Sequence, residues 1–204
     1  MANSHFKSVG QVIGQYPLRY KREKFLHEVF CEPPEWFLEN LDLATSRQAE
    51  DENEFFFRES LIYPFLQQAW KPYRHLKLWS HQKLIYDDTL SGEPDYLIST
   101  WRDEVIDKWV NTPLLAVAEA KRQDFEEGWG QCLAEMIACQ KLNQDENLTV
   151  YGIVSTGMVW EFGQLEKTQF TKHPYSYSIA DPQKVLGGLD YVFAACEKQT
   201  QLST

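Results

Sequence analysis

Three residues in two separate segments have the chemistry of a metal-assisted hydrolytic site. Asp95 follows Pro94 in the segment EPDYLIST, and Glu119 and Lys121 lie two residues apart near the end of LLAVAEAKRQ. Two carboxylates at one point suit Mg²⁺, which takes one or two of them and completes its coordination with waters or phosphate oxygens. A lysine beside them can hold the attacking water while the metal stabilises charge on the phosphoryl oxygens. This combination predicts phosphodiester hydrolysis.

These three side chains can meet only if their segments are neighbouring strands of one sheet. Residues 114–121 have the composition of a buried strand, in which alternate side chains point to opposite faces. Glu119 and Lys121 share one face with Leu115 and Val117, and the other face carries mainly alanines. A buried carboxylate and amine are costly unless they pair, form hydrogen bonds or hold a metal. We expect the small alanine face to be the one that the next helix approaches.

The other apolar patterns predict a mixed α/β domain. The segment EFFFRESLIYPFLQQAW, residues 54–70, has the three- and four-residue spacing of a helix, with a kink or boundary at Pro64. The strand patterns of residues 76–86 and 95–100, with a turn between them, predict an antiparallel pair. The order helix, three strands, helix, two strands, helix predicts a mixed β-sheet with helices on both faces. The later elements of this order are a helix over 128–142, two strands within 147–166 and a helix from Pro182 to Lys198.

The length and composition of the chain predict one main domain. A chain of 204 residues with 43% hydrophobic residues can bury a substantial core. We expect residues 1–50 to form a helical N-terminal extension packed on the core, in which Pro33 and Pro34 break one helix and start another. The main body of the fold is expected over residues 51–204.

The charge and the cysteines restrict the possible partners and location. The chain has 20 basic and 30 acidic residues, a formal net charge of −10, which disfavours a general nucleic-acid binder but leaves room for a local basic patch. The cysteines have no zinc-ligand spacing, and neither a signal-peptide core nor a run of about 18 apolar residues is present. We therefore expect a soluble, cytoplasmic protein with reduced thiols. Its four cysteines are Cys31, Cys132, Cys139 and Cys196.

A basic segment is the best candidate for contact with phosphates. Residues 71–83 contain several cations and no acidic residue, and Trp79 is available for stacking on a base. The alternative is a solvated strand face, because charge runs are usually only soluble surface. The predicted nucleic-acid-binding residues are Lys71, Arg74, Lys77 and Lys83.

Other catalytic classes have no support in the sequence. The chain lacks the G-x-S-x-G nucleophile elbow, the G-x-x-x-x-G-K-[ST] phosphate loop, the G-x-G-x-x-G dinucleotide turn and the H-E-x-x-H zinc helix.

The hydrolytic residues resemble the PD-(D/E)XK nuclease superfamily, which includes restriction endonucleases and the nuclease domains of type I restriction motor subunits. The similarity covers residues 51–160 and consists of the Pro94-Asp95 pair, the triplet Glu119-Ala120-Lys121 and Gln131 on the following helix. An acidic residue on the first helix precedes them: Glu54 lies four residues before Arg58 in ENEFFFRESLIYPFL, ahead of a Leu-Ile pair.

The resemblance implies a restriction-endonuclease-like fold and a Mg²⁺-dependent nuclease, with Mn²⁺ as a possible substitute. It implies that Asp95, Glu119 and the Ala120 carbonyl bind the metal and that Lys121 positions the attacking water. Gln131 would orient the lysine or contact the substrate backbone. The first-helix acid, Glu54 or in its place Glu59, would reach the metal through water. DNA is the implied substrate rather than RNA, and a homodimer or a larger complex is a further possibility.

Simpler interpretations of the same residues stay open. Glu119 and Lys121 can be an ion pair on a solvated strand end, and Asp95 can be a turn residue that is favoured by local hydrogen bonds. Gln131 can have a surface or capping role. At the level of function, the alternative is a catalytically inactive nuclease-like domain that acts as a binding or assembly module, which the net charge favours.

Overall fold

The computed structural model describes residues 6–27, 30–102, 110–121 and 124–202 of the chain, and these residues form a mixed α/β fold. Within them, the main sheet has eight strands, and a separate small sheet pairs β3 (Leu84–Ile85) with β4 (Ser91–Gly92). The strand order of the main sheet is β1 (Arg19–Arg22), β9 (Gln169–Lys172), β8 (Val159–Glu166), β7 (Val150–Ser155), β6 (Leu114–Ala120), β5 (Tyr96–Thr100) and β2 (Leu76–Ser80), with β10 (Tyr177–Ser178) paired to β8.

The main sheet contains both parallel and antiparallel pairs. β6 runs parallel to β7, and β1 runs parallel to β9, whereas the other neighbouring strands are antiparallel. Parallel neighbours need a long crossover, which α5 (Phe125–Asn143) supplies between β6 and β7. The mixed sheet that the element order predicts is therefore confirmed.

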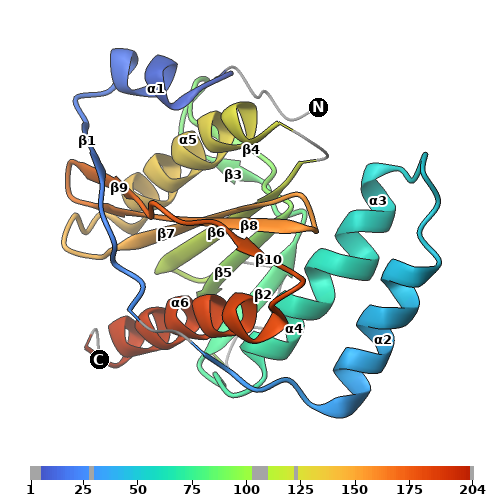
Figure 1. Cartoon of the computed structure of the whole chain (residues 1–204). Helices are drawn as coiled ribbons and strands as arrows, with labels where there is room; N and C mark the ends of the chain where they lie inside the picture. The colour runs from blue at the N-terminus through green and yellow to red at the C-terminus, as the bar shows by residue number, and fades with distance from the viewer. Residues whose placement is uncertain (1–5, 28–29, 103–109, 122–123, 203–204) are drawn as a thin grey trace.

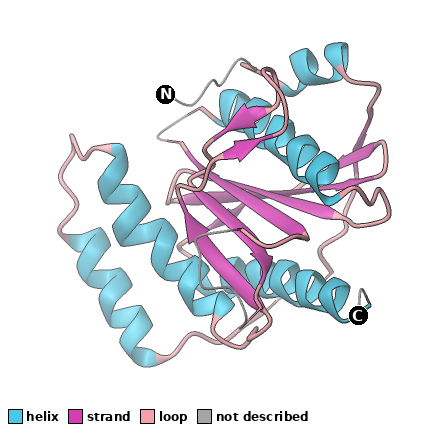
Figure 2. Cartoon of the chain, turned by 180° about the vertical axis from the view of Figure 1, so that it is seen from behind, coloured by secondary structure: helices cyan, strands magenta, loops and turns pink. Residues whose placement is uncertain are grey.

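Helices cover both faces of this sheet, as the sequence predicts (Figure 1). On one face, α5 lies with α1 (Val9–Gln15) over a core that includes Leu97, Val117 and Trp129. On the other face, α6 (Pro182–Leu202) and α4 (Tyr63–Trp70) enclose a second core around Phe65 and Phe162. The view from behind shows the same two layers of helices with the sheet between them (Figure 2).

The first 50 residues contribute more than the helices that we expected. α1 packs on α5, and α2 (Glu35–Ser46) lies beside the helical segment that follows it (Figure 1). Between these helices, β1 joins the edge of the main sheet next to β9. All four residues of β1 are exposed, which explains why its sequence RYKR has no apolar alternation to reveal a strand.

The predicted helix over residues 54–70 is one continuous helical segment with a change of winding in its middle. Asn53 caps α3 (Glu54–Phe56), because its side chain accepts a hydrogen bond from the Phe56 N–H. A wider π-helical stretch, η1 (Phe57–Ile62), leads into α4, where Pro64 stands in the first turn, which tolerates proline. Such π-helical stretches occur frequently at functional sites.

Two expectations about the strands need correction. The predicted strand 76–86 ends at Ser80, because His81 adopts a left-handed backbone conformation with φ of 51° and the chain leaves the main sheet. The alanine face of β6 lies against the core of α4 and α6 rather than against α5. The handedness of a β-α-β crossover determines the side on which its helix lies, and the size of the side chains does not.

Among the described residues, none of the helices combines the length and the apolar character that crossing a lipid bilayer requires.

Candidate active site

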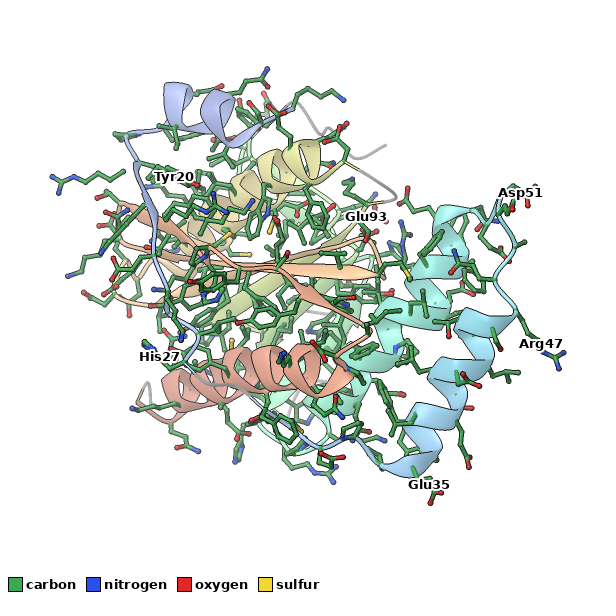
Figure 3. All side chains as sticks on the ribbon, viewed as in Figure 1. Tyr20, His27, Glu35, Arg47, Asp51 and Glu93 are labelled. Atoms are coloured by element: carbon green, nitrogen blue, oxygen red, sulfur yellow. The ribbon has the colours of Figure 1, made fainter. Side chains whose placement is uncertain are left out.

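Asp95 and Glu119 lie side by side at one end of the main sheet. β5 and β6 pair antiparallel with Tyr96 opposite Ala118, and one further step along this register sets Asp95 beside Glu119. The Ala120 N–H donates a hydrogen bond to Asp95 Oδ2 at 2.7 Å. Figure 3 labels Glu93, two residues before Asp95, at the end of the sheet that faces the α3 and η1 helical segment. The expectation that the two segments are neighbouring strands is confirmed.

The other oxygen of Asp95 is held by an arginine from the π-helical stretch. Arg58 Nη2 lies 2.8 Å from Asp95 Oδ1 and donates a hydrogen bond to Glu54 Oε1 at 2.7 Å. The guanidinium stacks over the Phe55 ring, 5.3 Å from its centroid, and Arg58 Nη1 lies 3.3 Å from His81 Nε2. Arg58 thus links the first helical segment to the carboxylate at the start of β5.

Glu119 and Lys121 form an ion pair at the end of β6. Lys121 Nζ lies 3.6 Å from Glu119 Oε2, and the Lys121 N–H donates a hydrogen bond to the Ser155 carbonyl at 2.8 Å. The Glu119 side chain is only 5% exposed, whereas 21% of the Lys121 side chain is exposed. Lys121 can therefore reach a substrate at the surface, while Glu119 contributes an oxygen from the interior.

A third acidic residue, Glu135 on α5, completes the buried cluster. Glu135 is buried, and its carboxyl interacts with that of Glu119. On the other side, Gly92 of β4 comes so close that a Cβ there would lie 2.8 Å from Glu135 Oε1. Sequence reasoning missed Glu135, although its position four residues after Gln131 places both residues on one helical face.

Several buried oxygens of this cluster lack a hydrogen-bond donor. Within the described part of the chain, no donor reaches Glu119 Oε1, Gln131 Oε1 or Glu135 Oε2. Buried acceptors without partners are rare and cost roughly 1 to 3 kcal/mol each. The buried donor Arg58 Nε of the same site also has no partner among the described residues, so the site contains unpaired groups of both kinds, and its oxygens are free to accept protons or a cation.

Burial raises the pKa values of the acidic side chains. It raises the pKa of Asp95 although the Ala120 N–H and Arg58 act in the opposite direction. Burial, followed by the charge of Asp95, raises the pKa of Glu119 to about 7. The pKa of Glu135 lies well above its ordinary value because of burial and the charge of Glu119. Burial therefore favours the protonated forms of Glu119 and Glu135 more than it would for exposed carboxyls.

The donor set fits a hard divalent cation that obtains most of its ligands from elsewhere. No group of three or more histidine, cysteine, aspartate or glutamate side chains in the described ranges is arranged to hold a metal ion. Mg²⁺ is usually bound by one or two carboxylates with waters and substrate phosphates, and Asp95 and Glu119 are such a pair. For Asp95 to bind a metal through Oδ1, the Arg58 guanidinium has to move aside.

The other predicted site residues differ in their exposure and in how they are connected to Asp95 and Glu119. Glu54 is tied to Asp95 only through Arg58, and its side chain is 44% exposed. Glu59 is exposed on η1, and Gln131 is half-buried on α5. Arg58 is the second residue whose role the sequence did not reveal, since only its spacing from Glu54 was visible.

Three of the four predicted phosphate-binding residues lie together. Lys71, Arg74 and Lys77 line one cavity at the Leu76 end of β2. Lys83 is exposed beyond Ser80, which is the other end of that strand.

Comparisons with protein-family models, with curated proteins and with solved structures find no match to this chain.

Proposed function

We propose that the protein is a metal-dependent nuclease with a restriction-endonuclease-like fold, which hydrolyses phosphodiester bonds of DNA. The observation that carries this proposal is the position of Asp95 beside Glu119 across the β5 and β6 pair, with Lys121 in contact with Glu119. The α5 crossover after β6 and the helical segment before β2 agree with the order of elements that the resemblance implies.

Asp95 and Glu119 are the residues that would hold Mg²⁺ or Mn²⁺, and the Ala120 carbonyl is the third candidate. A bound divalent ion supplies Lewis-acid stabilisation of the phosphoryl oxygens. The chain provides the rest of the chemistry. Lys121 would position the attacking water and donate a hydrogen bond to a phosphoryl oxygen on which negative charge develops. It reaches the surface from the strand end that Glu119 anchors.

Two residues of α5 support the pair from behind. Glu135 lies against Glu119, and a hydrogen bond between the two carboxyl groups would orient Glu119. Gln131, one helical turn earlier, has a buried oxygen with no donor among the described residues. Its amide would orient the lysine or contact the substrate backbone.

A second candidate function is a nuclease-like domain that binds without cleaving. The specific observation in its favour is that Arg58 and the Ala120 N–H already bind both oxygens of Asp95. A guanidinium that stays on Asp95 supplies the positive charge that a metal otherwise brings. The net charge of −10 favours the same alternative.

A cleavage assay with metal separates the two candidates. Purified protein is incubated with Mg²⁺ or Mn²⁺ and with single-stranded, double-stranded and branched DNA, and with RNA. We expect cleavage of DNA that a chelator abolishes. Lys121→Met is expected to slow it by about 100- to 1,000-fold because one donor to the developing charge is lost. The matched control is Lys141→Met, an exposed lysine in the last turn of α5.

Calorimetry with Mg²⁺ gives the second measurement. We expect binding that Asp95→Asn removes, because the amide keeps the shape of the side chain but not its charge. The nuclease proposal fails if every nucleic acid remains intact and the metal binds wild-type and Asp95→Asn protein equally. Retention of nucleic-acid binding in that case supports the binding module.

A further inference from the structure

A cavity of about 350 Å³ lies at the end of β2 that is farther from Asp95. The end of α4, the turn that leads into β2 and the residue after β5 form its walls. Its volume is within the range of small-molecule sites, roughly 300 to 1,000 Å³. It is lined by three cationic side chains and three aromatic rings: Lys71, Arg74, Lys77, Trp70, Tyr73 and Trp101.

Hydrogen bonds hold the rings of Trp70 and Tyr73 in this cavity. The Trp70 indole N–H donates to the Leu76 carbonyl at 2.8 Å, and the Tyr73 hydroxyl donates to Asp190 Oδ1 at 2.6 Å. The backbone N–H of Trp101 donates a hydrogen bond to the His75 carbonyl at 2.7 Å, which fixes the backbone at this residue, while 37% of Trp101 stays exposed. Rings that are fixed before binding lose little conformational entropy when a ligand arrives.

The charge of the cavity is positive although the chain is acidic overall. Lys77 Nζ lies 5.5 to 5.7 Å from the ring centroids of Trp70, Trp79 and Trp101, which hold the ammonium by cation–π contacts. Within the described residues, no lining residue is acidic and none of the three cations forms a salt bridge. An anionic group is the natural counterpart of such a site.

Two acidic residues of α6 lie near the cavity but are already engaged. Asp190 accepts the hydrogen bond of the Tyr73 hydroxyl, and Glu197 Oε1 accepts one from the His75 N–H at 3.1 Å. Lys71 Nζ donates a hydrogen bond to Gln68 Oε1 at 2.9 Å and lies 4.4 Å from the centroid of the Trp36 ring, so it can meet a ligand only through its remaining N–H groups. Arg74 forms no salt bridge within the described residues.

We infer that this cavity binds one nucleotide unit of a single-stranded nucleic acid, with the base stacked on Trp101 and the phosphate held by Lys71 and Arg74. Exposed aromatic side chains stack on bases of any sequence, and cations in a groove bind the backbone. A base that is paired and stacked in a duplex offers no free face to Trp101. The cavity therefore favours a single strand.

The inference extends the proposed function. It rests on that function only for the claim that the bound strand is cleaved. Asp95 and Trp101 stand six residues apart at opposite ends of β5, which corresponds to about 20 Å. The helical segment gives a similar length, since Arg58 near Asp95 and Trp70 at the cavity are twelve residues apart, about 18 Å. A strand with the axial rise of B-form DNA, about 3.4 Å per phosphate, would cross this span in about six nucleotides, and a more extended single strand would cross it in fewer. A mononucleotide should bind at the cavity without reaching Asp95.

Fluorescence anisotropy with a labelled oligothymidine of about ten nucleotides, in the presence of a chelator, tests the cavity by itself. We expect Trp101→Ala to weaken binding by about 5- to 100-fold, and Trp101→Phe to retain most of it. Arg74→Ala should reduce the slope of log affinity against log salt by about one. The matched controls are Tyr175→Ala, an exposed aromatic that follows β9 on the far side of the sheet, and Arg47→Ala, an exposed arginine after α2.

Three further ligands make the outcome specific. A blunt DNA hairpin should bind wild-type protein and Trp101→Ala equally, and thymidine monophosphate or a trinucleotide should displace the labelled strand. Displacement by the monophosphate shows that free nucleotides enter the cavity as well as strands. The inference is overturned if Trp101→Ala binds the strand like wild type, if Tyr175→Ala loses as much, or if neither short ligand displaces the probe.

The failure of this inference is distinguishable from the failure of the proposed nuclease. If strand binding depends on Trp101 but no cleavage occurs when Mg²⁺ is added, the nuclease proposal is rejected and the inference about the cavity is retained. If cleavage depends on metal but strand binding does not depend on Trp101, the inference about the cavity is rejected and the nuclease proposal is retained.

Discussion

The Arg58 guanidinium lies 2.8 Å from Asp95 Oδ1, on the carboxylate that the family resemblance makes a metal ligand. Both side chains are largely buried, with 13% of Arg58 and 10% of Asp95 exposed. On the proposal that a divalent cation binds Asp95, the cation and this guanidinium would compete for the same oxygen. The group bound to Asp95 Oδ1 would then differ between the metal-free and the metal-bound protein.

Removal of Arg58 should destabilise the metal-free protein. Arg58→Met leaves Asp95 buried without its partner, and we expect the free energy of unfolding to fall by about 2 to 4 kcal/mol at neutral pH. Saturating Mg²⁺ should restore part of this loss, because the metal replaces the missing positive charge. Urea denaturation with and without Mg²⁺ measures both effects. Arg47→Met, at an exposed position, should change neither, and an Arg58→Met protein that is as stable as wild type would contradict the competition.

Metal binding should strengthen as the pH rises through about 7. The pKa of Glu119 is raised to about 7 by burial and by Asp95, and a metal binds only the ionised carboxylate. Below pH 7 the ion must displace a proton, which weakens binding by about tenfold per pH unit for one proton. Calorimetry in buffers of different ionisation enthalpy counts the released protons. Glu119→Gln should abolish binding, and an affinity that is constant between pH 6 and 8 would contradict this prediction.

Replacement of Glu135 by glutamine should stabilise the metal-free protein at alkaline pH. The pKa of Glu135 is raised, so the folded state holds a proton that the unfolded state loses, and stability falls as the pH rises above the unfolded value. Glu135→Gln removes this titration and supplies an N–H to Glu119. We expect a gain of about 1 to 3 kcal/mol at pH 8 and little change at pH 4.5.

Thermal or urea unfolding of wild type and Glu135→Gln at both pH values checks this sign. Glu146→Gln is the matched control at an exposed position and should have no effect at either pH. A Glu135→Gln protein that is less stable than wild type at pH 8 would show that Glu135 is ionised in the folded state.

A methyl group at Gly128 should impair cleavage by displacing Lys121. A Cβ at this first-turn position of α5 would lie 2.9 Å from Lys121 Cγ and 2.7 Å from Val154 Cγ1, closer than van der Waals contact allows. We expect Gly128→Ala to lower kcat by at least about tenfold, since small displacements of catalytic groups cost up to about 100-fold. Oligothymidine binding at the cavity should stay unchanged.

Gly14→Ala controls for the general effect of an alanine in a helix. Gly14 lies within α1, and nothing lies within 4 Å of a Cβ at that position. If Gly128→Ala cleaves DNA at the wild-type rate, Lys121 has no positional role in the reaction.

The sequence was sufficient for the parts of the fold that local periodicity determines. The two-residue period of residues 114–121 predicted β6, and the helical spacing over 54–70 predicted the segment that carries Glu54 and Arg58. Although the pairing of β5 with β6 is a result of the fold, the same patterns placed Asp95 at the start of one strand and Glu119 near the end of another. These features are predictable because burial of one face dictates which positions are apolar. β1 was not predictable, since its side chains are all exposed.

Only the tertiary structure decided which groups surround the predicted carboxylates. The contact of Arg58 with Asp95 joins positions 37 residues apart, and Glu135 meets Glu119 because the crossover sets α5 on the charged face of β6 rather than on its alanine face. Likewise, the residues of the basic segment lie in two places. Lys77 lines the cavity with Trp101 at one end of β2, and Lys83 lies beyond the other end. Sequence spacing records which face a residue occupies within its own element. The partner that this face meets depends on strand order and crossover handedness, which arise only when the whole chain packs.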